Sequence, residues 1–125
     1  MPNIRSYRIN GYSMLPRLLA VALKRSLELF PAVLLEGPRQ VGKSTLARSF
    51  GRPYVTLDDL QTLADARRDP DRFVRSLPVP VTIDEAQRVP DLMLSVKAAI
   101  DRDRKPGSFL LTGSAGILVI PKVAE

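Results

Sequence analysis

The chain has 125 residues, of which 45% are hydrophobic and 26% charged, and this is the composition of a single globular domain. Cysteine and histidine are both absent, which excludes disulfides, thiol catalysis, zinc sites of the Cys/His kind and acid–base schemes that need imidazole. The net charge of +6 is concentrated in residues 1–53, which hold nine Lys or Arg against two Asp or Glu, and this half predicts an anionic partner such as a nucleotide, a nucleic acid or a membrane surface.

The first half of the chain predicts two strands and two helices. Residues 1–13 are polar and aperiodic, and we expect a loose lead-in there. Leucines near helical spacing predict a helix over 16–30, with proline in its first turn. The short apolar run at 32–35 ends in Gly-Pro and is typical of a buried parallel strand. A helix over 44–50 and a second strand over 54–57 follow.

The second half continues the alternation of helices and strands. Residues 60–77 are helical in pattern, in two pieces separated by a proline. A third strand is expected over 81–83, a helix over 91–102 and a fourth strand over 109–111, after which residues 117–120 are again apolar. Alternating strands and helices predict an α/β domain with a mainly parallel sheet.

No part of the sequence predicts membrane insertion or export. No stretch approaches the ~20 apolar residues of a membrane span. The run Leu18–Leu23 is shorter than the ~7–15 apolar residues of a signal peptide, and Lys24 and Arg25 follow it at once. We therefore expect an amphipathic helix there, no membrane partner and a cytoplasmic location.

Residues 37–44 match the phosphate-loop pattern G-x-x-x-x-G-K-[ST]. The two glycines allow a tight turn and a close approach of the backbone to phosphate, so that successive N–H groups can form an anion nest. We expect the Lys43 ammonium to reach the β- and γ-phosphates and the Ser44 hydroxyl to bind Mg²⁺. The nucleotide is expected to contact Gly37, Pro38, Arg39, Gln40, Val41, Gly42, Lys43, Ser44 and Thr45.

Two carboxylates follow the third predicted strand. Asp84 fits the Asp that holds Mg²⁺ in phosphate-loop enzymes, and Glu85 is then placed to orient and deprotonate the attacking water. Asp58 and Asp59 form a rival pair after another strand, and we rank them second, with a capped loop as their ordinary explanation.

The end of the fourth strand is expected to face the γ-phosphate. Ser114 is the first candidate for a residue that senses this phosphate, and Thr112 is the second. An ordinary Ser/Gly turn after a strand is the alternative explanation of both.

Five segments together resemble one family: residues 30–35, 37–44, 54–59, 83–90 and 101–114. They resemble the predicted AAA+ ATPases of the AAA_14 type, whose members usually carry a second domain, DUF4143, at the C-terminus. The resemblance implies a P-loop NTPase fold, a three-layer α/β/α sandwich with strand order 5-1-4-3-2, in a partial ATP-binding domain over residues 14–125. It also implies ATP and Mg²⁺ as cofactors, Gly37–Ser44 as the Walker A motif, Asp84 and Glu85 as the Walker B motif, and Thr112–Ser114 as sensor 1.

Family members are considerably longer than this chain. We therefore expect the fifth strand, the helical lid and the C-terminal domain to be lacking, which would leave strand 32–36 as a sheet edge unless residues 117–120 cover part of it. Arg102 and Arg104 are candidates for an arginine that acts on a neighbouring subunit's nucleotide, so self-association is an alternative to the C-terminal domain as a partner.

Four functions stay open from the sequence. The first is an ATP-binding domain that hydrolyses ATP, and the second is a fragment that binds nucleotide without turnover. The third is a nucleic-acid-binding module that uses the basic first half, although no base-reading motif accompanies the charge. A small-molecule kinase is the fourth, and the paired carboxylates suit water activation better than transfer to an acceptor.

Overall fold

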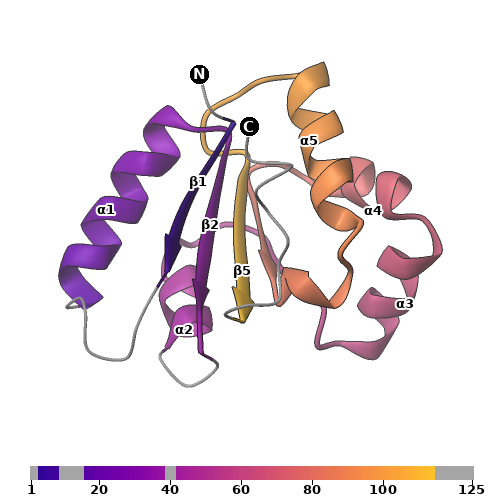
Figure 1. The fold of residues 1–125 in the computed structure, drawn as a ribbon, viewed down its shortest axis with the longest axis horizontal. Coiled ribbons are helices and arrows are strands. Elements are labelled where there is room, and N and C mark those ends of the chain that lie inside the picture. The colour runs from indigo at the N-terminus through magenta and orange to yellow at the C-terminus, as the bar shows by residue number, and fades with distance from the viewer. Residues whose placement is uncertain (1–2, 9–15, 39–41, 115–125) are drawn as a thin grey trace.

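The protein is a three-layer α/β/α sandwich around a five-stranded sheet (Figure 1). The computed structural model describes residues 3–8, 16–38 and 42–114. All paired strands are parallel, in the order β1-β2-β5-β4-β3. The strands are β1 (Ile4–Arg8), β2 (Ala32–Gly37), β3 (Tyr54–Thr56), β4 (Val81–Asp84) and β5 (Phe109–Ser114). The predicted P-loop NTPase-like α/β class is therefore confirmed.

Helices cover both faces of this sheet. On one face lie α1 (Pro16–Leu29) and α2 (Lys43–Arg48), and on the other lie α3 (Leu60–Arg68), α4 (Pro70–Ser76) and α5 (Leu92–Arg102) (Figure 1). A short 3₁₀ turn, η2 (Ala86–Arg88), follows β4. Proline separates α3 from α4, as expected, and the Asp69 carboxylate accepts a hydrogen bond from the Arg72 N–H at the start of α4.

The sheet is buried on both sides, and this explains the continuous apolar run of β2. Val33 and Leu35 pack with leucines of α1 on one face. Ala32 and Leu34 pack into the larger cluster beneath α3, α4 and α5 on the other face. Side chains from both faces therefore hold β2, which leads directly into the predicted phosphate loop.

The expectation of a loose lead-in was wrong for residues 4–8, and so was the expectation that strand 32–36 is a sheet edge. Residues 4–8 form β1, which pairs in parallel with β2 from Ile4 opposite Ala32 to Arg8 opposite Glu36. In the order implied by the family resemblance, this N-terminal strand occupies the position beside the phosphate-loop strand that a later strand was expected to fill. Strand β2 is consequently an inner strand. Residues 117–120, expected to cover it, lie outside the described part of the chain.

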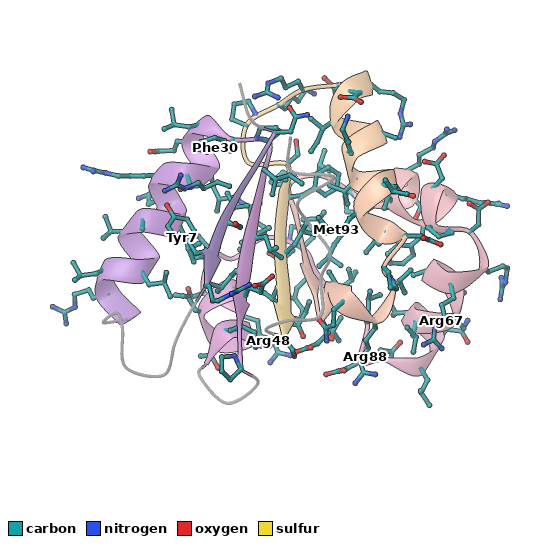
Figure 2. All side chains as sticks on the ribbon, in the orientation of Figure 1. Tyr7, Phe30, Arg48, Arg67, Arg88 and Met93 are labelled. Carbon is teal, nitrogen blue, oxygen red and sulfur yellow. The ribbon has the colours of Figure 1, made fainter. Side chains whose placement is uncertain are left out.

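Two apolar side chains pack β1 against the domain, one on each face of the sheet. Ile4 is buried in the core cluster of the α3–α5 face. Tyr7 points to the opposite face, where it packs against the α1 cluster and its hydroxyl lies 2.7 Å from the Ser26 Oγ (Figure 2). Each face of the strand thus contributes only one apolar side chain, so no alternating pattern reveals it in the sequence.

Candidate nucleotide-binding site

The candidate site lies at the carboxyl edge of the sheet. Parallel strands all end at this edge, at the bottom of Figure 1, which brings Gly37, Thr56, Asp84 and Ser114 together from four strands. In open α/β sheets, ligands bind in the crevice beyond these strand ends.

The predicted phosphate loop connects β2 to α2 at this edge. Gly42 has a φ of 81°, a left-handed conformation that glycine adopts without strain. Lys43 is only 1% exposed, and its Nζ donates a hydrogen bond to the carbonyl oxygen of Pro38 at 3.0 Å. Its ammonium is therefore folded back across the loop. Residues Arg39, Gln40 and Val41, expected to contact the nucleotide, lie outside the described residues.

Asp84 accepts hydrogen bonds from three hydroxyl groups. Ser44 Oγ donates to its Oδ1 at 2.8 Å, Thr112 Oγ1 donates to the same oxygen at 2.6 Å, and Thr56 Oγ1 donates to Oδ2 at 2.9 Å. Burial raises the pKa of Asp84, but the hydrogen bonds from these hydroxyls outweigh burial and hold the pKa below its ordinary value. The carboxylate is therefore ionised at neutral pH although it is almost fully buried.

Tyr54 lies beside this group. Its ring packs beneath the guanidinium of Arg48, at 4.7 Å from the ring centroid. Its hydroxyl is buried and makes no hydrogen bond of normal geometry within residues 3–8, 16–38 and 42–114. Burial raises the pKa of Tyr54, and the neighbouring Asp84 carboxylate raises it further. Among the described residues, the Tyr54 hydroxyl is thus a polar atom at the site without a hydrogen-bond partner.

Hydrogen bonds hold both the backbone and the side chain of Glu85. Its backbone has a φ of 57°, and its N–H donates to the Thr112 Oγ1 at 3.0 Å. Its carboxylate oxygen Oε1 accepts from the Gln87 Nε2 at 2.7 Å and from the Ser114 Oγ at 3.3 Å. The carboxylate is therefore fixed between the end of β5 and the turn η2.

The rival acidic pair has two different roles. Asp59 caps α3, because its Oδ2 accepts from the Thr62 N–H at 3.0 Å, which is the ordinary explanation that the sequence offered. Asp58 instead lies with Asp84 and Glu85, and one carboxylate oxygen of each is within 4.8 Å of the others. Arg88 also reaches this edge (Figure 2), and its Nε is 2.6 Å from the Asp58 Oδ1.

The structure brings most of the predicted site residues together. Direct hydrogen bonds connect Ser44 and Thr112 to Asp84, and Ser114 to Glu85. Lys43 is buried at the start of α2, and Thr45 is exposed on the same helix.

Sequence reasoning missed four residues of the site: Tyr54, Thr56, Gln87 and Arg88. The position of Thr56 at the end of a predicted strand was a usable signal, since neighbouring strands end at the same edge. Gln87 and Arg88 gave none, because their contacts depend on the turn after Glu85.

Most of the chain is similar in sequence to known proteins. The family model AAA_14, described as an AAA domain, matches residues 29–125. The chain belongs to this AAA domain family. It is accordingly a nucleotide-binding P-loop domain of the AAA ATPase type.

Two mycobacterial proteins are similar to the chain. They are "Uncharacterized protein Mb2031c" of Mycobacterium bovis and "Uncharacterized protein Rv2008c" of Mycobacterium tuberculosis, each 45% identical over 100 residues that cover 77% of this chain. The match covers 22% of each relative, so this chain corresponds to about a fifth of their length. Among the described helices, none combines the length and the apolar character needed to cross a bilayer.

Proposed function

We propose that this domain binds ATP with Mg²⁺ at the carboxyl edge of the sheet and hydrolyses it. The observation that carries the proposal is the 2.8 Å hydrogen bond from the Ser44 Oγ to the Asp84 Oδ1. Ser44 is the last residue of the phosphate-loop motif and Asp84 ends a different strand, yet the two side chains meet. In P-loop NTPases, a loop Ser or Thr and an Asp of this kind hold Mg²⁺ between them. We therefore assign Gly37–Ser44 as the Walker A motif and Asp84–Glu85 as the Walker B motif.

The phosphates would bind inside the loop. The Lys43 ammonium already lies within it, where the Pro38 carbonyl accepts its hydrogen bond. A phosphate oxygen is a stronger partner for an ammonium than a neutral carbonyl is, because both groups are then charged. We infer that Lys43 exchanges this contact for the β- and γ-phosphates when nucleotide binds.

The residues present fit a magnesium ion. Mg²⁺ prefers hard oxygen ligands, and this edge offers the Ser44 hydroxyl and the Asp84 carboxylate, which is kept ionised by its hydrogen bonds. The Tyr54 hydroxyl, which has no hydrogen-bond partner among the described residues, supplies a further polar group for the water that the ion retains. When bound, the ion neutralises charge on the β- and γ-phosphates.

Glu85 is assigned as the general base. It is buried and lies beside the metal-binding carboxylate, so it can accept a proton from a water aimed at the γ-phosphate. Ser114, whose hydroxyl contacts Glu85, is assigned to sense the γ-phosphate. Thr112 is assigned a positioning role, because it hydrogen-bonds both to the Asp84 carboxylate and to the Glu85 N–H.

Calorimetry with ATP–Mg and a turnover assay test this assignment. Lys43→Ala removes the charged partner of the phosphates and should weaken binding by about 2–3 kcal/mol, or roughly 30- to 150-fold. Glu85→Gln should bind nearly normally and turn over poorly. Lys97→Ala is the control, since within the described residues Lys97 pairs only with Asp101 on its own helix α5, more than fifty positions along the chain from the loop.

Three results would each contradict a part of the proposal. If Lys43→Ala and Lys97→Ala bind ATP–Mg equally well, the loop is not the binding site. If Glu85→Gln turns over as fast as the wild type, Glu85 is not the base. Binding without turnover in the wild type would favour the alternative of a nucleotide-binding fragment.

A further inference from the structure

The side chain of Gln87 bridges the end of β5 to Glu85. Its Oε1 accepts a hydrogen bond from the backbone N–H of Ser114 at 3.2 Å, and its Nε2 donates to the Glu85 Oε1 at 2.7 Å. A backbone N–H can only donate and an ionised carboxylate can only accept. The amide therefore has one orientation that satisfies both neighbours.

This bridge is buried and rests on an unusual backbone. Gln87 is 8% exposed and Glu85 is 4% exposed, so water competes little for either contact. Glu85 adopts a left-handed φ of 57°, the one positive φ among the described non-glycine residues. The turn that follows is closed by the Arg88 N–H, which donates to the Glu85 carbonyl oxygen at 3.1 Å. Backbone strain of this kind persists where surrounding contacts over-determine it.

Both side-chain donors meet the same oxygen of Glu85. Gln87 Nε2 and Ser114 Oγ each lie within hydrogen-bond distance of Oε1. Within the part of the chain that the structure describes, Oε2 accepts no hydrogen bond from protein. One carboxylate oxygen is thus used to hold the group, and the other remains available to a water molecule.

We propose that Gln87 is a positioning residue for ATP hydrolysis, whose amide fixes Glu85 to the end of β5 so that Oε2 faces the attacking water. The inference rests on the proposed function and deepens it. Because the same amide accepts from the Ser114 N–H, a movement of Ser114 towards a bound γ-phosphate is transmitted to Glu85 through one side chain. Presence of the γ-phosphate and alignment of the base are then linked directly.

Two substitutions at Gln87 separate the two halves of the bridge. Gln87→Met keeps the length and loses both contacts, whereas Gln87→Glu keeps an acceptor for the Ser114 N–H and loses the donor to Glu85. Each should lower kcat by about ten-fold or more, while the Kd for ATP–Mg changes less than about two-fold, because Glu85 acts on the water and not on binding.

Gln61 supplies the matched controls. Its Nε2 also donates to a carboxylate, the Asp65 Oδ1 at 3.0 Å, but on the exposed surface of α3. Gln61→Met and Gln61→Glu should leave kcat and Kd at wild-type values. A loss of kcat in Gln87→Met that is matched by an equal loss of ATP affinity would indicate a structural role and overturn the proposal, as would unchanged kcat.

Hydrogen exchange at the Ser114 amide tests the bridge without any turnover. Gln87→Met should speed this exchange, whereas Gln87→Glu should keep it slow, since an acceptor remains. If Gln87→Met leaves the exchange rate unchanged, the bridge does not exist and the inference fails, whatever the turnover. A wild-type protein that binds ATP–Mg without turning it over refutes the hydrolysis proposed above and, with it, the positioning role; the exchange result then identifies the bridge as structural.

Discussion

Replacing Thr112 by valine removes a single hydroxyl that serves two partners. The hydroxyl donates to the Asp84 Oδ1 at 2.6 Å and accepts from the Glu85 N–H at 3.0 Å, and the side chain is fully buried. Valine has nearly the same shape, so the substitution tests the hydrogen bonds and leaves the packing almost unchanged. The Glu85 N–H is left without its partner in a residue that is only 4% exposed.

The expected loss of stability follows from these two contacts. A hydrogen bond to a charged group contributes about 1.5–3 kcal/mol, and a buried donor left unsatisfied costs about 1–3 kcal/mol. Thr112→Val should therefore lower the free energy of unfolding by about 3–5 kcal/mol. Thr112→Ser, which keeps the hydroxyl and loses one methyl group, should cost only about 1 kcal/mol.

Thr82 provides the matched control for the same change. It is also fully buried, on the neighbouring strand β4, but its Oγ1 has no hydrogen-bond partner among the described residues. Thr82→Val removes a hydroxyl that lost its hydrogen bonds to water on folding and formed none with the described residues. The substitution should be neutral or stabilise the protein by up to about 1 kcal/mol.

Urea unfolding of the apo protein measures the difference. With an m-value of about 1–3 kcal/mol/M, the Thr112→Val midpoint should fall by about 1 M or more below the Thr82→Val midpoint. Equal midpoints for the two valine variants would refute the reasoning, because they would mean that the network around Asp84 contributes no stability. A Thr112→Ser variant as unstable as Thr112→Val would refute it in the same way.

Three further predictions concern the scaffold. Hydrogen bonds from the Thr62 backbone and side chain lower the pKa of Asp59. The charged cap therefore stabilises α3 fully above the unfolded pKa of about 3.9 and loses this effect as the pH falls through the lowered folded pKa. Asp59→Asn carries a neutral cap and should lose less stability than the wild type between pH 6 and pH 2 in urea unfolding. Gly107→Ala should lower the thermal midpoint more than Gly51→Ala, because both have positive φ but only at Gly107 would the new Cβ meet a backbone oxygen, that of Leu27, at 2.9 Å. Ile4→Ala should destabilise the domain by about 2–4 kcal/mol in urea unfolding, whereas a loose lead-in would give no change.

The central strands and the main site residues could be predicted because their signals are local. Strand β2 begins with a continuous apolar run and ends in the first glycine of the phosphate loop, and Asp84 ends β4, another fully buried strand. Parallel strands that end at one edge then bring the two motifs together without any knowledge of side-chain packing.

The first strand and the bridge at Gln87 have no such signal. Strand β1 has one buried residue, Ile4, and is held by pairing with residues almost thirty positions further along the chain. Gln87 reaches Glu85 because the Glu85 backbone adopts a left-handed conformation. This conformation is rare for glutamate and cannot be predicted from the residue type. The sequence also could not separate Asp58 from Asp59, which are adjacent and identical. Asp58 lies at the candidate site, whereas Asp59 caps α3.

Strand β1 also affects whether strands of two copies of the domain can pair at the edge of the sheet. It is short, carries Arg5 and Arg8 on its surface, and therefore presents a poor template for further strand pairing. The strand that it covers is the reverse: all six residues of β2 are buried, and four of them are Ala, Val, Leu and Leu in sequence. An unpaired edge of that composition is the kind of segment that forms cross-β aggregates. Pairing with residues 4–8 removes such an edge from β2, the strand that leads into the phosphate loop.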